Sequence, residues 1–204
     1  MRVALVALAV ATGCAHLPAN ALCVPVVEQE TDYSCGPATL LAILRYWQRP
    51  VASEQELYPS LHTTAKDGTE PFMLEAVARA HGLRAEYRIG ATVEDLRAAL
   101  AAGTTVIVDL QAWRDTPHPW RDDWDDGHYI VLVAIDGDRL YAMDPSADRG
   151  YSWLTLGELE ERWHDFEMRD GKRRNLQHMA VFISGDAHVS SGARVGGARA
   201  EKLR

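Results

Sequence analysis

The spacing of apolar positions changes along the chain, from helical spacing in the first half to short strand-like runs in the second. An apolar run over 35–48 predicts a helix, and helical spacing over 69–82 and 92–103 predicts two more. The segments 105–111, 128–135 and 139–144 are short and rich in Val, Ile and Leu, as buried strands are. Because the helices precede most of the strands, this order predicts an α+β domain in which helices pack on an antiparallel sheet.

Weaker signals complete this pattern. Extended segments are expected at 83–88 and 178–184, and Ser53, Thr92 and Thr155 each stand three residues before an acidic residue, as in a capping box at a helix start. A long polar loop is expected over 112–127, and the charged stretch 168–174 is expected to be a solvated loop.

The two ends of the chain differ in composition from its body. Residues 1–22 combine Arg2 with an apolar run over 3–12 and then small residues, which is typical of an export signal. That run is too short for a permanent membrane anchor. The small and polar segment 185–204 is predicted to be disordered. One domain is therefore expected over 23–184.

The export signal can be processed in two ways. Cys14 follows Ala11-Thr12-Gly13 and resembles the lipidated cysteine of a bacterial lipoprotein, which would attach the protein to a membrane. Alternatively, cleavage after the small-x-small sequence Ala19-Asn20-Ala21 would release a soluble protein. Both alternatives predict an exported protein of the periplasm or cell envelope.

Charge and composition exclude some classes of function. The 204 residues carry a formal net charge of −8, whereas nucleic-acid binding needs a basic face, so no nucleic-acid partner is expected. The His and Cys residues lack the spacing of a zinc site, and the acids near 122–126 lack that of a calcium loop. We expect no metal and no cofactor.

Cys35 is the strongest candidate for chemistry because it stands at the start of the first predicted helix. The unpaired backbone N–H groups there favour an anion, and the thiolate is the reactive form of cysteine. Two other roles remain open for Cys35. It is either a small buried apolar residue, or the partner of Cys23 in a disulfide, since export leads to an oxidising compartment.

A thiol nucleophile needs a base and a group to orient that base, and one predicted hairpin supplies both. His128 begins the first strand and Asp144 ends the second. If the connecting loop is the three residues 136–138, the two side chains lie on one face as diagonal neighbours. A two-residue turn would place them on opposite faces.

Further candidates lie close to these residues in the sequence. Gln29, six residues before the thiol, is a candidate donor to the oxyanion of the transition state. Three tryptophans precede His128 and either line a substrate groove or attach the long loop to the body: Trp113, Trp120 and Trp124.

Three motifs in this order resemble those of the papain-like cysteine peptidases: Gln29-x4-Ser34-Cys35-Gly36-x-Ala38, then Gly127-His128, then Asp144-Pro145. Within that class, the chain most resembles the double-glycine leader peptidases, which process bacteriocin precursors, and their exported stand-alone relatives. The resemblance covers about residues 24–184 and implies the papain-like fold. It also implies Cys35 as nucleophile, His128 as base and acid, Asp144 as orienting group and Gln29 as oxyanion donor.

The sequence departs from the leader peptidases at Ser34, where they usually carry aspartate, and it shows no transporter domain. We therefore expect an exported, stand-alone cysteine peptidase whose partner is a peptide or protein substrate, with maturation after Gly-Gly-like small residues as one possibility. An acyltransferase or amidase with the same residues, or a non-catalytic peptide-binding domain on the same scaffold, are the alternatives.

Overall fold

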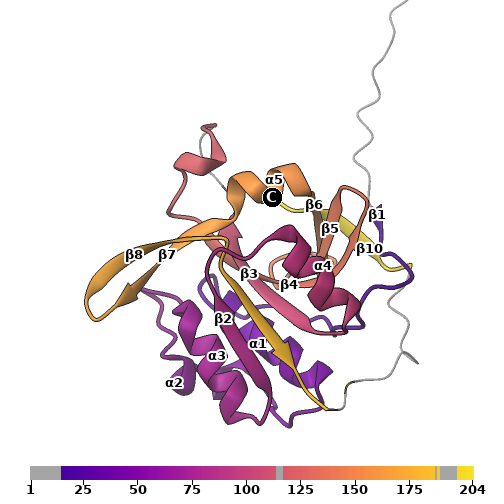
Figure 1. Cartoon of the computed structure of the whole chain (residues 1–204). Helices are drawn as coiled ribbons and strands as arrows, with labels where there is room; N and C mark the ends of the chain where they lie inside the picture. Colours follow the sequence, from indigo (N-terminus) through magenta and orange to yellow (C-terminus); the bar gives the residue numbers. More distant parts are fainter. Residues whose placement is uncertain (1–14, 114–116, 187, 189–196) are drawn as a thin grey trace, which may run out of the picture.

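The structure is a computed structural model, and it describes residues 15–113, 117–186, 188 and 197–204 (Figure 1). An eight-stranded sheet forms its centre, with the strand order β1-β10-β6-β5-β4-β3-β9-β2, and a separate hairpin of β7 and β8 projects from the body. The helices are α1 (Cys35–Tyr46), α2 (Tyr58–Leu61), α3 (Pro71–Ala80), α4 (Val93–Ala101) and α5 (Leu156–Arg162), with short 3-10 turns η1 (Glu54–Glu56) and η2 (Trp120–Asp122). The strands are β1 (Ala15–His16), β2 (Arg84–Arg88), β3 (Thr105–Gln111), β4 (Gly127–Asp136), β5 (Arg139–Met143), β6 (Tyr151–Thr155), β7 (His164–Arg169), β8 (Lys172–Gln177), β9 (Ala180–Ser184) and β10 (Arg199–Lys202).

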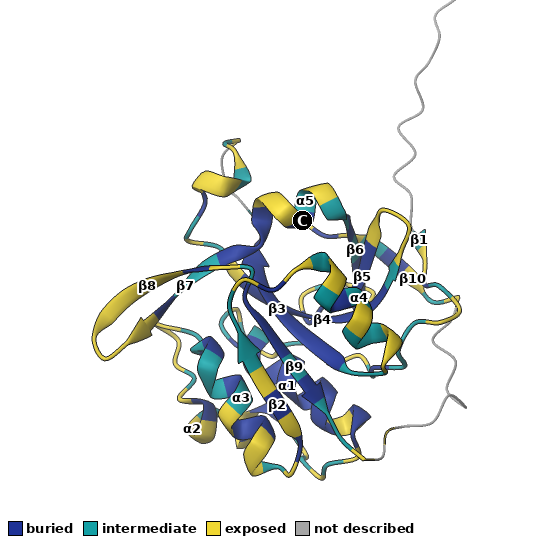
Figure 2. Ribbon diagram, in the orientation of Figure 1, coloured by how far each residue is buried: buried dark blue, intermediate teal, exposed yellow. Residues whose placement is uncertain are grey.

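Helices cover both faces of the sheet. Helices α1, α2 and α3 pack with Ile107, Val131 and Val181 on one face, whereas α4 and α5 pack with Val108 and Ile130 on the other. The central strands are therefore buried on both sides, as the dark blue strands in Figure 2 show. This burial explains why β3 and β4 are continuous apolar runs rather than alternating ones. The predicted α+β class with a mainly antiparallel sheet is confirmed, and the one parallel pair is β6 with β10.

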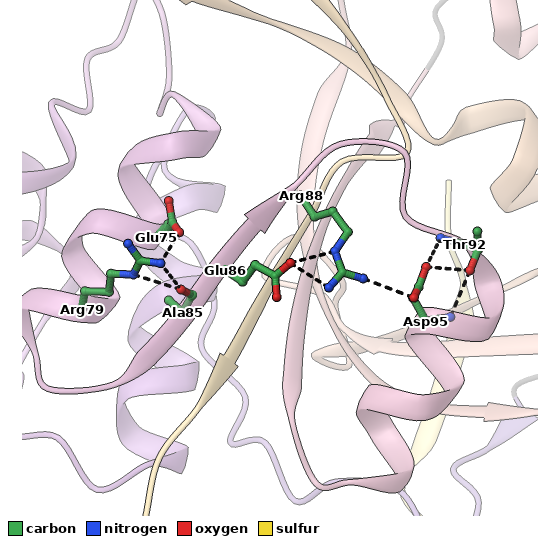
Figure 3. Close-up of polar contacts among 7 residues, drawn as sticks. All are labelled: Glu75, Arg79, Ala85, Glu86, Arg88, Thr92 and Asp95. Atoms are coloured by element: carbon green, nitrogen blue, oxygen red, sulfur yellow. Dashed lines mark hydrogen bonds and ion pairs between the residues drawn. The ribbon is translucent and has the colours of Figure 1, made fainter.

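Local signals at two helix starts have the predicted effect. Thr92 accepts a hydrogen bond from the Asp95 N–H at 3.1 Å, and the Asp95 carboxylate accepts one from the Thr92 N–H at 2.9 Å, which completes a capping box at the start of α4 (Figure 3). Arg88, in β2, extends this contact by pairing with both Glu86 and Asp95. Thr155 forms the same capping box at α5.

Two local predictions are wrong. Ser53 makes no side-chain cap bond at the start of η1. The charged stretch 168–174 is not a loop but the end of the β7–β8 hairpin, which is largely exposed (Figure 2). Its strands lack the alternating apolar pattern because neither face packs fully on the core, so periodicity could not reveal them.

The predicted disorder of 185–204 is wrong for the last eight residues of the chain. Residues 199–202 form β10 between β1 and β6, where Ala200 is fully buried and Leu203 packs into the core. Strand pairing and the burial of Ala200 and Leu203 order this segment, although its composition alone suggests disorder. At the other end, Leu17 is also buried, so the folded body begins before residue 23. Within the described ranges, no helix has the length and apolarity needed to cross a membrane.

Candidate functional site

Three predicted residues from different elements meet at one end of the sheet. Cys35 is the first residue of α1, His128 lies near the start of β4, and Asp144 directly follows β5. His128 Nε2 lies 2.9 Å from Asp144 Oδ1, and the two side chains are 1% and 4% exposed. The predicted neighbours on the hairpin are therefore in direct contact and shielded from water.

The hairpin turn differs from the predicted one. Asp136 pairs with Arg139, so the turn contains only Gly137 and Asp138 and not the three residues 136–138. Gly137 has φ 56° at the first central position, which suits a type II′ turn. By itself, this two-residue turn would have placed the histidine and the aspartate on opposite faces of the hairpin.

A β-bulge corrects the register farther along the same hairpin. The pairing shifts by one residue between Leu132 and Ala134, and beyond the shift Val131 pairs with Met143. The extra residue at the shift is Val133, which opposes no partner of its own. Together the two-residue turn and the bulge give the same register at the active end as the predicted three-residue loop.

The Cys35 thiol interacts with the side of the His128 imidazole that does not contact Asp144. A hydrogen bond that its sulfur accepts from the imidazolium, and the charge of the thiolate, both raise the pKa of His128. Because Nε2 contacts Asp144, Nδ1 is the ring nitrogen left for the thiol. Nδ1 is buried and makes no hydrogen bond of good geometry within the described residues. The thiol, the imidazole and the carboxylate therefore form a line.

The charges of His128 and Asp144 stabilise each other. Burial disfavours an imidazolium, but the Asp144 charge outweighs it and raises the pKa of His128 from 6.5 to about 9. Burial would likewise raise the pKa of Asp144, yet His128 and hydrogen bonds from Ser146 hold that pKa well below its usual range. At neutral pH the pair is an imidazolium and a carboxylate.

Ser146 is a site residue that the sequence prediction missed. Its N–H and its hydroxyl both donate to Asp144 Oδ1, at 2.9 and 2.8 Å. An aspartate whose side chain accepts from the N–H two residues later forms an Asx-turn, and Asp144-Pro145-Ser146 carries the residue types for one. That turn holds the carboxylate toward His128.

The Cys35 thiol opens into a groove of about 280 Å³. The start of α1, the loop 66–70, the start of β4 and strand β7 surround it. Gly36 lets α1 approach this loop closely, because a Cβ at that position would lie 2.6 Å from the Thr69 side chain. The glycine of the Cys-Gly motif is therefore a packing requirement.

Comparison with known proteins agrees with this geometry. The Peptidase C39 like family matches residues 21–169, a segment that contains all three residues of the line. The chain belongs to this family of cysteine peptidases.

Relatives of the C39-like chain include a protein named "probable functional amyloid protease FapD" of Pseudomonas aeruginosa, which is 25% identical over 147 residues. That match covers 68% of this chain and 57% of the relative, so the chain spans little more than half of its length.

Solved structures share the fold. A C39-like peptidase from Bacillus anthracis superposes with a TM-score of 0.61 at 16% identity, covering 81% of this chain and 96% of its own. A double-glycine-motif protease from an AMS/PCAT transporter, solved with its leader peptide, has a TM-score of 0.56 at 19% identity and covers 81% and 94%. The papain-like fold predicted from the motifs is confirmed.

Gln29 lies at the edge of the C39-like site. Its backbone N–H donates to the Pro145 carbonyl at 2.9 Å, next to Asp144. Its side-chain Nε2 donates to the Thr31 carbonyl at 2.7 Å, and its Oε1 is buried without a hydrogen-bond partner in the described structure. One amide hydrogen is therefore bonded to Thr31, and the hydrogen bonds of the described structure do not use the other.

The three predicted tryptophans have different places. Trp113 packs on the His128 ring with a centroid distance of 4.4 Å and covers the imidazole. Trp124 lines the groove. Trp120 does not line it but lies under the Arg162 guanidinium, 4.0 Å from the ring centroid, and attaches the long loop to α5.

The remaining predictions concern a disulfide, lipidation and metal binding. Cys23 and Cys35 are both free thiols, so the alternative of a disulfide between them is not realised in this structure. Cys14 lies outside the described residues. Across the described ranges, no group of three or more His, Cys, Asp and Glu side chains is arranged to hold a metal ion.

Proposed function

We propose that this C39-like chain hydrolyses peptide bonds, with Cys35 as nucleophile, His128 as general base and acid, and Asp144 as the group that orients His128. The observation that carries the proposal is the buried contact of 2.9 Å between His128 and Asp144, with the thiol on the other side of the ring. The carboxylate holds the imidazole in one orientation and stabilises its charged form. The raised pKa of His128 favours an imidazolium beside a thiolate, the reactive state of a thiol enzyme.

The reaction follows from this arrangement in two stages. The Cys35 thiolate attacks the peptide carbonyl carbon, and the C–N bond of the resulting tetrahedral intermediate breaks as His128 gives its proton to the leaving amine. A water molecule then attacks the thioester while His128 takes its proton. The C–S bond breaks, which releases the carboxylic acid and the free thiol.

The negative oxygen of each intermediate needs hydrogen-bond donors. The N–H groups at the start of α1 are unpaired within the helix, and Gln29 stands beside them with a second amide hydrogen. Loss of one such donor costs about 3–4 kcal/mol of transition-state stabilisation, so Gln29→Ala is expected to lower kcat by roughly 100- to 1000-fold.

The substrate in this proposal is a peptide cleaved after small, Gly-Gly-like residues. Support comes from the structural neighbour that was solved with a leader peptide and described as a double-glycine-motif protease. Membership of the C39-like family supports the same class of substrate.

Export with lipidation at Cys14 is also part of the proposal. Strand β1 and Leu17 lie between the two candidate processing sites and pack onto the folded body. Cleavage after Ala21 would remove both, whereas processing at Cys14 retains them. The intact mass of protein from a bacterial membrane fraction tests this point: a Cys14→Ser variant that keeps the wild-type mass and membrane association would contradict it.

The peptidase proposal is tested with internally quenched peptides that contain Gly-Gly, Ala-Ala or Leu-Leu at their centre. Wild type is expected to cleave the first best, Cys35→Ala to cleave none, and the matched cysteine control Cys23→Ala to remain active. Mass spectrometry of the products with an added amine separates hydrolysis from acyl transfer. Undiminished turnover by Cys35→Ala would overturn the proposed function.

A further inference from the structure

Two buried carboxyl groups that the proposed reaction does not use lie in the groove beside Cys35. Asp109 comes from β3 and Asp165 from β7, and both line the groove. Burial raises the pKa of both residues, and a hydrogen bond links their side chains. A hydrogen bond between two carboxyl groups needs a proton, so the pair holds one proton and one negative charge near neutral pH.

The charge of this pair rests on Asp165. Asp109 is 2% exposed, and desolvation together with the neighbouring Asp165 holds its pKa well above the usual range. Asp165 is less buried, accepts the Phe166 N–H at 2.8 Å, and is also bonded by Gln111. Burial raises the pKa of Asp165 only to about 6, because these bonds and the nearby charge of Arg173 favour its charged form.

The pair also has an unused acceptor. Asp109 Oδ1 is buried and has no hydrogen-bond partner in the described part of the chain. Leaving such an atom unsatisfied costs about 1–3 kcal/mol. A ligand that donates hydrogen bonds and moves the Asp109 side chain toward the groove would remove this cost. Within the described residues, neither this pair nor the acids around it form a group arranged to hold a metal ion.

The rest of the groove has the same sign of charge. Among the described residues that line it, one is basic, Lys66, and its ammonium group is paired with Asp67 at 2.9 Å. The other acids along the groove are Asp32, Glu70 and Asp125. A cleft lined by one sign of charge concentrates ligands of the opposite sign.

We propose that this groove binds a cationic side chain of the peptide substrate, lysine or arginine, with Asp165 and Asp109 as its acceptors. The inference rests on the proposed peptidase function and names a feature of its substrate. A guanidinium or ammonium group carries several N–H donors, so it can bond to the Asp165 carboxylate and to the Asp109 carboxyl group together. It would also offset the repulsion between this pair and the Cys35 thiolate, which act on each other electrostatically.

The first arm of the test needs no peptidase activity. Three methanethiosulfonates that carry an aminoethyl, a methyl or a sulfonatoethyl group modify Cys35, and mass spectrometry of the Cys35 peptide gives each rate. Each rate is divided by that of the same reagent with free cysteine. At about 0.15 M salt, where the exposed rim acids are largely screened, the aminoethyl reagent is expected to keep an advantage of roughly tenfold over the methyl one.

Two variants and a control test which carboxyl group causes the rate advantage of the aminoethyl reagent. Asp165→Asn removes the charge and is expected to bring the corrected ratio to within about twofold of one, because a remaining neutral Asp109 attracts no cation. Asp109→Asn replaces a protonated carboxyl by an amide of similar shape, leaves the Asp165 charge, and is expected to reduce the ratio less. Asp138→Asn, an exposed acid in the β4–β5 turn, is the matched control and should leave it unchanged. Thermal unfolding verifies that each variant is folded.

The second arm compares internally quenched Gly-Gly peptides that differ only in arginine against citrulline, or lysine against norleucine, at each position around the cleavage site. A lower KM for the cationic member is expected at one position, and Asp165→Asn should abolish that difference. If no peptide is cleaved while the reagent advantage persists, the proposed function fails but the cation site stands. A wild-type reagent ratio equal to that of free cysteine, or an advantage that Asp165→Asn leaves intact, overturns the cation site.

Discussion

The Asp144–His128 contact makes the stability of this fold depend on pH in a way that one substitution should reverse. In the folded chain, burial disfavours the charged imidazole, but Asp144 outweighs it and raises the pKa of His128 from 6.5 to about 9. One pKa unit is about 1.4 kcal/mol, so the charged imidazole stabilises the fold by about 3 kcal/mol. The lowered pKa of Asp144 is the same interaction seen from its partner and is not added.

The sign of the dependence follows from which state binds the proton more tightly. In wild type the folded state does, so this stabilisation is complete below pH 6.5 and is lost as the pH rises through about 9. In Asp144→Asn the influence of burial, the largest on this group, is opposed only by the smaller contributions of Cys35, so the pKa of His128 is expected to fall below its unfolded value. The unfolded state of the variant then binds the proton more tightly, so the stability of the variant rises with pH up to about 6.5 and then stays level at the higher pH values where that of wild type falls.

Urea unfolding at several pH values between about 5 and 9 measures both curves. The difference between wild type and Asp144→Asn cancels groups common to both chains, such as the Asp109–Asp165 pair. Asp138→Asn removes an exposed carboxylate from the same hairpin and should run parallel to wild type. Parallel curves for wild type and Asp144→Asn would refute the reasoning that the carboxylate controls the charge of His128.

Three further changes probe the scaffold around the site. Gly36→Ala would place a methyl group 2.6 Å from the Thr69 side chain, and a loss of about 1–3 kcal/mol together with reduced activity is expected in unfolding and turnover assays; unchanged stability would show that the loop yields freely. Thr92→Ala breaks the capping box with Asp95 and should cost about 1 kcal/mol without affecting turnover, because α4 does not line the groove. Leu17→Ala removes a side chain that is 4% exposed and should cost about 2–5 kcal/mol in urea unfolding, whereas a negligible effect would mean that the N-terminal segment does not pack on the body.

The sequence was sufficient where a structural feature depends on neighbouring residues. Thr92 and Thr155 begin helices because each cap bonds to an acid three residues later, and this contact forms within one turn. Cys35 begins α1 for an equally local reason, with Pro37 in the first turn of an apolar run. These positions could be predicted without any knowledge of the tertiary structure.

The sequence was insufficient where the partner is distant and the pattern is weak. Asp109 interrupts an apolar strand, and nothing near it in the sequence indicates that Asp165 will meet it. Their contact depends on the charged β7–β8 hairpin, whose strands pair with each other and not with the main sheet. The burial of β10 depends in the same way on pairing with β1 and β6, more than 40 residues away in the sequence.

The β4–β5 hairpin, which carries His128, lies between these two cases. His128 and Asp144 share a face only if an odd number of residues in the hairpin is left out of the strand pairing. This requirement does not say where in the hairpin those residues lie. A three-residue loop would suffice, whereas the chain uses a two-residue turn and a bulge at Val133. The bulge leaves a carbonyl outside the strand ladder, and the Leu22 N–H donates to it at 2.8 Å. The register that aligns the imidazole with the carboxylate is therefore supported by a contact from the N-terminal segment, 111 residues earlier in the chain, which no local reading of the hairpin could reveal.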